Sequence, residues 1–201
     1  MKKILLILVL LSLSLNAQII IKHTAYEIHL DTILKEPTYT HYILTPTMTV
    51  KKFLRSSFTF DPLVAKKYQG SGFGSFDGKY GYDRGHLAPD VDFTALQVTE
   101  NEAMYYDNTA DQNSKLNRGT WKSLESYVHE LGKKQNVEVW TGCVYKGSVT
   151  KFNGLVVPLF YWKLIKYSGK TEAYKMPNTT PQFKDFKKYK VNEIEILNLI
   201  Q

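Results

Sequence analysis

The sequence contains few of the residues that build cross-linked or repetitive scaffolds. Its 201 residues include a single cysteine, Cys143, so no intramolecular disulfide can form and a zinc site built on several thiolates is excluded. Only 12 glycines and 7 prolines are present and no short period recurs, which excludes collagen-like and heptad-repeat architectures. Any metal ion must therefore be held by oxygen or imidazole ligands.

The chain also has fewer acidic than basic residues. The chain has 26 Lys and Arg against 19 Asp and Glu, which gives a formal net charge of +7 and a pI near 9.2. This balance favours anionic partners such as nucleic acid or an acidic surface. Hydrophobic residues make up 43% of the chain, enough for a core, and no linker rich in Pro, Gly or Ser divides it after Gln18. We therefore expect one domain over residues 18–201.

The first 17 residues have the composition of an export signal. Two lysines precede an apolar run from Ile4 to Leu11, and Ala17 supplies a small residue at the expected cleavage point. The run is short for a bilayer span. We expect a signal peptide over residues 1–17, an exported protein (secreted or periplasmic) and no stable membrane association after cleavage. The alternative is an uncleaved N-terminal anchor.

The remaining pattern predicts an α+β fold. Four segments are rich in β-branched and aromatic residues and predict strands of a central antiparallel or mixed sheet: 26–30, 39–44, 137–141 and 155–165. Thr99 and Glu102 have the spacing of a capping box and predict a short helix over 99–104. An apolar stripe predicts a longer flanking helix over 116–131, with Gly132 ending it. Cys143, beside a predicted strand, is expected to be buried and unreactive.

Residues suited to catalysis follow directly after a glycine-rich loop that ends at Tyr82. Asp83, Arg84, Gly85 and His86 place an acid, a cation and an imidazole in four consecutive positions. In a strand, Arg84 and His86 lie on one face and Asp83 on the other, so a phosphate could contact the guanidinium and the imidazole together. A histidine accepts a proton from water near neutral pH. A surface ion pair of Asp83 with Arg84, beside an incidental histidine, explains the string equally well.

A second group of polar residues lies at the start of the long predicted helix. Asn117 and Glu125 are eight residues apart, which places them within roughly 80° of each other around a helix. Together they could organise Mg²⁺, which keeps several waters and needs few protein ligands. The alternative for Asn117 is an amide that caps the helix N-terminus.

In combination these segments resemble the DNA/RNA non-specific endonucleases, the ββα-metal nucleases that include endonuclease G. The resemblance depends on residues 83–89, 108–112 and 116–125 in this order, and it extends over most of residues 24–180. It implies a ββα-metal active-site motif. The chain departs from the family pattern at Asp107 and Asp111, where the family often has Ser and Pro. Either carboxylate could disturb the local turn or repel phosphate.

The resemblance implies a role for each matching residue. His86 matches the general base, and Asn117 matches the sole direct protein ligand of Mg²⁺, for which Mn²⁺ can substitute. Arg55 and Arg84 match the residues that hold the scissile phosphate. The remaining two matches are supporting groups: Asn108 near the base and phosphate, and Glu125 beside the hydration shell of the ion.

The implied activity is Mg²⁺-dependent hydrolysis of DNA and RNA phosphodiester bonds, which leaves 5′-phosphate and 3′-hydroxyl ends. Two alternatives remain: an exported basic module that binds nucleic acid with a degraded, non-cleaving site, and a metal-dependent phosphodiesterase for small nucleotides. Lysines between Phe183 and Lys190 either follow a nucleic-acid backbone or form a solvated amphipathic segment. The sequence indicates neither an inhibitor protein nor an oligomeric state. No function is expected for the other histidines: His23, His29, His41 and His129.

Overall fold

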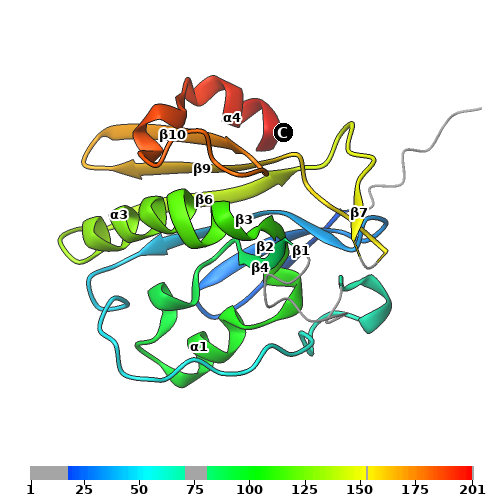
Figure 1. The fold of residues 1–201 in the computed structure, drawn as a ribbon. Coiled ribbons are helices and arrows are strands. Elements are labelled where there is room, and N and C mark those ends of the chain that lie inside the picture. The colour runs from blue at the N-terminus through cyan, green and yellow to red at the C-terminus, as the bar shows by residue number, and fades with distance from the viewer. Residues whose placement is uncertain (1–17, 71–80, 153, 201) are drawn as a thin grey trace, which may run out of the picture.

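The centre of the molecule is a seven-stranded sheet (Figure 1). The computed structural model describes residues 18–70, 81–152 and 154–200, so the expected signal peptide and most of the glycine-rich loop lie outside the described residues. All pairings of the sheet are antiparallel. Its strands, in spatial order, are β1 (Gln18–Lys22), β2 (Tyr26–Asp31), β3 (Glu36–Leu44), β6 (Val137–Val144), β9 (Phe160–Tyr167), β10 (Lys170–Pro177) and β11 (Lys190–Val191).

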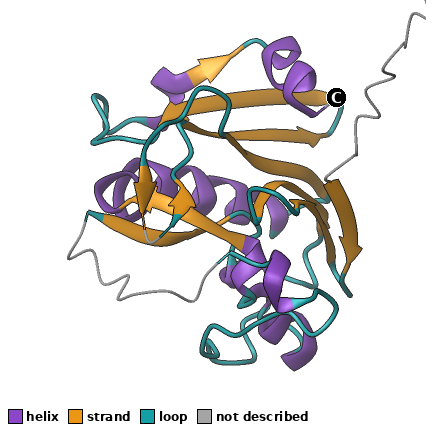
Figure 2. Ribbon diagram, turned by 90° about the vertical axis from the view of Figure 1, so that its right-hand side faces the viewer, coloured by secondary structure: helices purple, strands orange, loops and turns teal. Residues whose placement is uncertain are grey.

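Helices lie on both sides of this sheet (Figure 2). Strand β9 shows why both faces are covered, because its buried residues alternate between two clusters. Tyr161 and Ile165 belong to the main core, whereas Trp162 and Leu164 pack with Ile196 of helix α4 (Glu193–Ile200) on the opposite face. A strand that is apolar on both faces needs a layer on each. The sheet is therefore the middle layer of an α+β domain, as the sequence predicts.

The main core lies between the sheet and a layer that is continuous in sequence. This layer begins with β4 (Tyr82–His86), which pairs antiparallel with β5 (Thr109–Asn113) to form a separate ribbon. The other elements of the layer are η2 (Asp90–Phe93), α1 (Gln97–Ala103), η3 (Tyr106–Asn108), α2 (Ser114–Leu116), the π-type turn η4 (Asn117–Trp121) and α3 (Lys122–Gly132). Smaller elements elsewhere are η1 (Lys66–Tyr68), β7 (Lys151–Phe152), β8 (Leu155–Val156) and η5 (Phe186–Tyr189).

Three of the four predicted strands are confirmed, but the fourth, over 155–165, is two strands of different sheets, β8 and β9, with Pro158 between them, which cannot donate to a ladder. Both predicted helices are present and the longer one ends at Gly132 as predicted, but the predicted cap of the first and the predicted start of the second are wrong. Thr99 lies inside α1 and does not cap it; its hydroxyl donates to the carbonyls of Phe93 and Leu96. The longer helix is interrupted by η4, where Gly119 has non-helical dihedral angles. Gly132 is the last residue of α3 and is buried against Leu44. Its small size serves this close packing of helix and sheet.

The remaining predictions concern the thiol and the membrane. Cys143 is buried in β6, and burial raises the pKa of its thiol well above the usual value, as expected for an unreactive cysteine. Among the described residues, no helix combines the length and the apolar character that crossing a bilayer requires.

We predict that Gly142→Ala destabilises the fold. Gly142 lies in the centre of the sheet, and a β-carbon there meets the indole of Trp162 and lies 2.5 Å from the carbonyl oxygen of Thr38. The backbone at Thr38 cannot yield easily, so the free energy of unfolding should fall by about 1–3 kcal/mol. Chemical denaturation followed by tryptophan fluorescence measures this change. Thr150→Ala, at an exposed position, should stay within about 0.5 kcal/mol of wild type; equal effects of the two substitutions would contradict the packing argument.

Candidate active site

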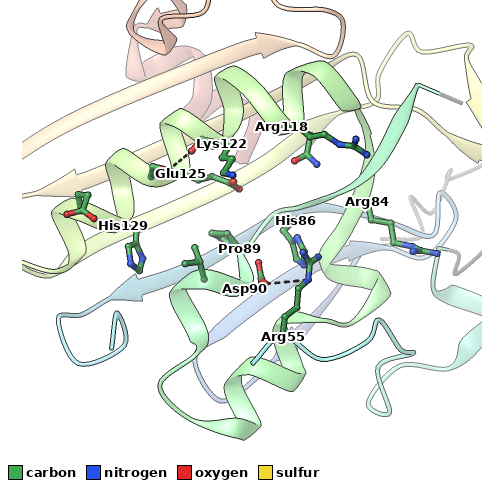
Figure 3. Close-up of a pocket in the computed structure, with 13 residues that line it drawn as sticks. Arg55, Arg84, His86, Pro89, Asp90, Arg118, Lys122, Glu125 and His129 are labelled. Atoms are coloured by element: carbon green, nitrogen blue, oxygen red, sulfur yellow. Dashed lines mark hydrogen bonds and ion pairs between the residues drawn. The ribbon is translucent and has the colours of Figure 1, made fainter. Parts of the chain in front are cut away.

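A cavity of about 410 Å³ lies between β4, η2 and the N-terminal part of α3 (Figure 3). Most residues that the sequence singles out for chemistry line this cavity: Arg55, Arg84, His86, Asn117 and Glu125. They come from a coil, from the β4–β5 ribbon, from η4 and from α3. The fold therefore brings together residues that are 70 positions apart in the chain, 55 to 125.

The ribbon presents Arg84 and His86 on the cavity side, as strand alternation predicts. Between them, Gly85 pairs with Ala110 of β5 and lies beneath the side chain of Gln112. A β-carbon at Gly85 would lie 2.6 Å from the β-carbon of Gln112, which is fully buried. Glycine at this position therefore lets the two strands approach closely.

Asp83 lies on the other face of the ribbon and binds the start of the helical segment. Its carboxylate accepts hydrogen bonds from Asn117 Nδ2 (3.0 Å), Arg118 Nε (2.9 Å) and Arg118 Nη2 (2.6 Å). The ion pair of Asp83 is thus formed with Arg118, and the alternative of a local Asp83–Arg84 surface pair is not what the structure contains. The second alternative also fails, because Asn113, and not Asn117, caps the helical segment through its side-chain oxygen.

His86 is almost fully enclosed. The residue is 9% exposed, and its ring stacks on Phe58 with a centroid distance of 5.2 Å. Its Nε2 is buried and has no hydrogen-bond partner among the described residues. Burial lowers the pKa of His86 to about 4; the charge of Asp90 opposes this shift and that of Arg55 adds to it. The imidazole is therefore neutral at pH 7 and able to accept a proton.

Arg55 and Arg84 both lie against the ring of Phe58. The guanidinium carbons of Arg55 and Arg84 lie 5.4 and 5.2 Å from the centroid of Phe58. Arg55 also pairs with Asp90, with 3.5 Å between Nε and Oδ2. Arg84 lies 5.3 Å from the ring of Tyr106. Cation–π contacts of this kind hold guanidinium groups without using all of their donors.

Asn108 is the exception among the predicted residues, because it does not line the cavity. It is fully buried, and its side chain accepts from the backbone N–H of Ala88 and donates to the carbonyls of Ala88 and Ala103, at 2.8–2.9 Å. These bonds fix the chain that follows His86 against the end of α1. The structure thus gives Asn108 a positioning role behind the site, and contact of its side chain with a phosphate is not indicated.

Glu125 experiences the charge of a buried lysine, Lys163, that the sequence does not reveal. Burial raises the pKa of Glu125 to about 7, an effect that the charge of Lys163 opposes and those of Asp92 and Asp90 reinforce. Lys163, on β9, is 0% exposed and donates to Thr141 Oγ1 at 2.5 Å. Burial lowers the pKa of Lys163 to about 8, against the opposing charge of Glu125. Lys163 lies in the middle of a strand, where sequence patterns suggest an apolar residue.

His129 was expected to lack a function, yet it lines the cavity one turn after Glu125. Its Nδ1 lies 2.7 Å from Oδ1 of Asp92, which is buried and accepts a second bond from the hydroxyl of Tyr42. This pair comes from η2 and α3, which form opposite walls of the cavity. Periodicity could have indicated that His129 shares a helix face with Glu125, since the two residues are four positions apart.

The two carboxylates that depart from the family pattern are both buried. Asp107 is 0% exposed and does not line the cavity. Asp111 is paired with Arg84 in the register of β4 and β5. Burial raises the pKa of Asp111 to about 7, and the charge of Arg84 opposes this shift. The ribbon and η3 form regularly around both residues, so neither carboxylate prevents the local turn from forming.

The donor set of the cavity fits a hard divalent cation. The amide nitrogen of Asn117 is used by Asp83, which leaves its carbonyl oxygen as the free ligand atom. Glu125 provides a carboxylate on the same wall. Oxygen donors of this kind, few in number, are typical of Mg²⁺ and Mn²⁺ sites.

A family model described as DNA/RNA non-specific endonuclease matches residues 11–199. The chain belongs to this family. Among solved structures, a crystal structure of the EndoG/EndoGI complex superposes with a TM-score of 0.76 and 25% identity, over 89% of this chain and 82% of that chain. The α+β fold and the recognition of the family from the sequence are therefore confirmed.

Curated relatives of this family match the chain over part of its length. They include a nuclease from Nostoc (33% identical; 59% of this chain and 48% of the relative) and human mitochondrial endonuclease G (32% identical; 55% and 40%). A salivary endonuclease from Lutzomyia longipalpis is 32% identical over 45% of this chain and 25% of its own length. The chain thus spans at most about half the length of these relatives.

We predict that His86 titrates far below an ordinary histidine. NMR titration of the imidazole resonances, assigned with His86→Gln, should give a midpoint near 4 instead of about 6.5. Because the charge of Arg55 lowers this pKa and that of Asp90 raises it, Arg55→Gln should move the midpoint up and Asp90→Asn should move it down. A midpoint at or above 6.5 in the wild-type protein would show that the ring is not enclosed as described.

Proposed function

We propose that this chain is a Mg²⁺-dependent endonuclease that hydrolyses phosphodiester bonds of DNA and RNA, with His86 as the general base and 5′-phosphate and 3′-hydroxyl ends as products. The observation that carries the proposal is the convergence of a neutral imidazole, two arginines and a free amide oxygen on one cavity, those of His86, Arg55, Arg84 and Asn117. Family membership supports it. We also propose export, on the composition of residues 1–17 alone.

Each side chain has a definite task in this mechanism. Arg55 and Arg84 bind the oxygens of the scissile phosphate and offset the charge that develops on them. His86 accepts a proton from the attacking water; its Nε2 has no accessible surface, so the acceptor facing the water is Nδ1. Asn117, through Oδ1, would be the direct protein ligand of Mg²⁺, and Glu125 would bind the hydration shell of the ion. The ion would supply Lewis-acid stabilisation of the departing 3′-oxygen.

A basic groove beside the cavity favours a polymer over a small nucleotide as substrate. A second cavity of about 520 Å³ shares Arg118, Lys122 and Ser126 with the first and continues to Lys115 and Lys184. The lysines and Arg118 are exposed. A row of cations that extends beyond the reacting phosphate matches the backbone of a longer strand. A phosphodiesterase that acts only on small nucleotides would not need this groove to bind its substrate.

The binding module without turnover has weaker support. It was suggested by the carboxylates of Asp107 and Asp111, but both are buried, and Asp107 does not line the cavity. The residues to which the proposal assigns phosphate binding, proton acceptance and cation binding all line the cavity: Arg55, Arg84, His86 and Asn117. We therefore expect turnover.

The first test is cleavage of DNA and RNA by the purified chain. Linear DNA and RNA should be degraded with Mg²⁺ and left intact with chelator, and His86→Ala should lower the rate by about 10²–10⁴-fold because the general base is lost. Agarose gels with end-group analysis measure both the rate and the products. The control His41→Ala changes a partly exposed histidine of β3 and should retain activity.

Three results would count against the proposal. Wild-type protein that retards DNA without shortening it favours the binding module. Cleavage of a chromogenic diester but not of DNA favours the small-nucleotide enzyme. Full plasmid cleavage by folded His86→Ala removes His86 from the role of base.

We predict that Asp83→Asn weakens the response to Mg²⁺. The substitution removes the charge that orients Asn117 and Arg118, so the Mg²⁺ concentration for half-maximal activity should rise by about 10–100-fold, the usual cost of losing a partner of a metal ligand. Activity measured against Mg²⁺ concentration gives this value. Arg118→Gln leaves the Asp83–Asn117 bond in place and should shift the Mg²⁺ requirement less. A lower rate with an unchanged Mg²⁺ requirement would contradict the assigned role of Asp83.

A further inference from the structure

A second group of metal-ligand side chains lies apart from the active-site cavity. His23, Asp61 and Asp107 each offer one donor atom, and these atoms lie within 4.8 Å of one another. None of the three residues lines the active-site cavity. His23 comes from the turn between β1 and β2, Asp61 from the coil before η1, and Asp107 from η3. The group therefore joins three segments that are distant in sequence.

These donor atoms are buried, and most of them lack hydrogen bonds. The side chains of His23 and Asp61 are 1% and 0% exposed, and Asp107 is 0% exposed. Both ring nitrogens of His23, Oδ2 of Asp61 and both carboxylate oxygens of Asp107 have no hydrogen-bond partner within the described part of the chain. Burial of such groups is costly unless an opposite charge compensates it. Two carboxylates facing one imidazole are short of positive charge unless the group takes up a proton or a cation.

The donor atoms of His23 and Asp61 have the spacing expected of two ligands on a small tetrahedral ion. His23 Nε2 lies 3.2 Å from Asp61 Oδ2. Donors bound to Zn²⁺ at 2.0–2.2 Å in a tetrahedron are about 3.4 Å apart. With one oxygen of Asp107 the three side chains offer three ligand atoms, and a water molecule would complete the tetrahedron. Imidazole and carboxylate together suit Zn²⁺ better than Mg²⁺.

Surrounding contacts hold two of the ligands in place. The backbone N–H of Leu63 donates to Asp61 Oδ1 at 2.7 Å, which leaves Oδ2 for the contact with His23. The ring of His23 packs against Tyr26 and Tyr105, with centroid distances of 4.8 and 5.4 Å. Ligands that are oriented by their neighbours in this way lose little entropy when an ion binds.

A surface cavity of about 200 Å³ adjoins the group and is lined by His23 together with Lys22, Tyr26, Glu27 and His41. The side chain of His23 is only 1% exposed, so this cavity reaches the residue but not its ring nitrogens. A buried metal site needs an entry path in addition to its ligands, and displacement of the His23 ring from this side would provide it.

We propose that His23, Asp61 and Asp107 form a structural binding site for a transition-metal ion, and that this ion is Zn²⁺. Its two positive charges balance the two carboxylates. The ion fixes the coil that carries Arg55, Phe58 and Asp61 to the first hairpin and to η3, which leads into Asn108 and β5. The parallel bridge between Thr59 and Tyr105 already links this coil to the segment before η3, and the ion would add a second link.

Counting bound zinc tests this site without reference to nuclease activity. The purified chain is stripped with chelator, exchanged into buffer with millimolar Mg²⁺ to saturate the Asn117 site, incubated with ZnCl₂ and gel-filtered. Mass spectrometry of the metal content should find one Zn²⁺ per chain, with a raised melting temperature. In Asp107→Asn and His23→Gln, calorimetric titration should show affinity for Zn²⁺ reduced by more than about 100-fold, since loss of a mere partner to a ligand already costs about 10–100-fold.

A matched control is available on the surface of the sheet. His41 lies 3.6 and 3.1 Å from carboxylate oxygens of Glu27 and Glu138, yet it is 26% exposed, and His41→Gln should keep the bound zinc. The isosteric Asp107→Asn keeps the volume of the side chain, and circular dichroism confirms that it is folded. The proposal is overturned if wild-type protein retains no Zn²⁺ or if all variants bind it equally. It is also overturned if Asp107→Asn raises the melting temperature to the same extent with and without Zn²⁺. That result would show that the two carboxyls share a proton and do not bind a metal ion.

Discussion

The carboxylate of Asp83 connects the two halves of the candidate active site. Strand β4 presents Arg84 and His86 to the cavity, and Asp83, on its other face, binds Asn117 and Arg118 of η4. The side chain of Asp83 is only 7% exposed, so these charge-assisted bonds act at low screening. A shift of η4 along the ribbon would break all of them together. The distance between the proton acceptor and the free amide oxygen is thereby fixed by one buried side chain.

Burial then determines which charges the site carries. His86 is neutral because its ring is enclosed against Phe58, while the same ring of Phe58 supports two guanidinium groups that stay charged. Burial raises the pKa of Glu125, on the opposite wall, to about 7, and the charge of the buried Lys163 behind it opposes this rise only in part. The site thus combines an uncharged base with fixed cations, the combination that hydrolysis of an anionic ester requires.

The sequence predicts most of the strands, the two faces of β4 and five of the residues that line the cavity, because each depends on local alternation or on a short ordered motif. It does not predict the interruption at η4 or the true cap at Asn113, since these depend on how the ribbon meets the helix. Phe58 and Lys163 could not be found either. A phenylalanine in a coil and a lysine within a strand acquire a role only through partners that are distant in sequence.

The departures at positions 107 and 111 show where this chain differs from its family without losing the site. A carboxylate at a buried position needs a compensating charge or a proton. Asp111 has Arg84 opposite it in the ribbon, and this cation offsets part of the cost of burial, which still raises the pKa of Asp111 to about 7. Asp107 faces away from the cavity, toward Asp61 and His23, where no cationic side chain other than His23 takes part in the group that is described. The two carboxylates therefore have different consequences. Asp111 adds a neighbour to Arg84, to which we assign phosphate binding, whereas Asp107 creates the demand for positive charge from which we infer the zinc site.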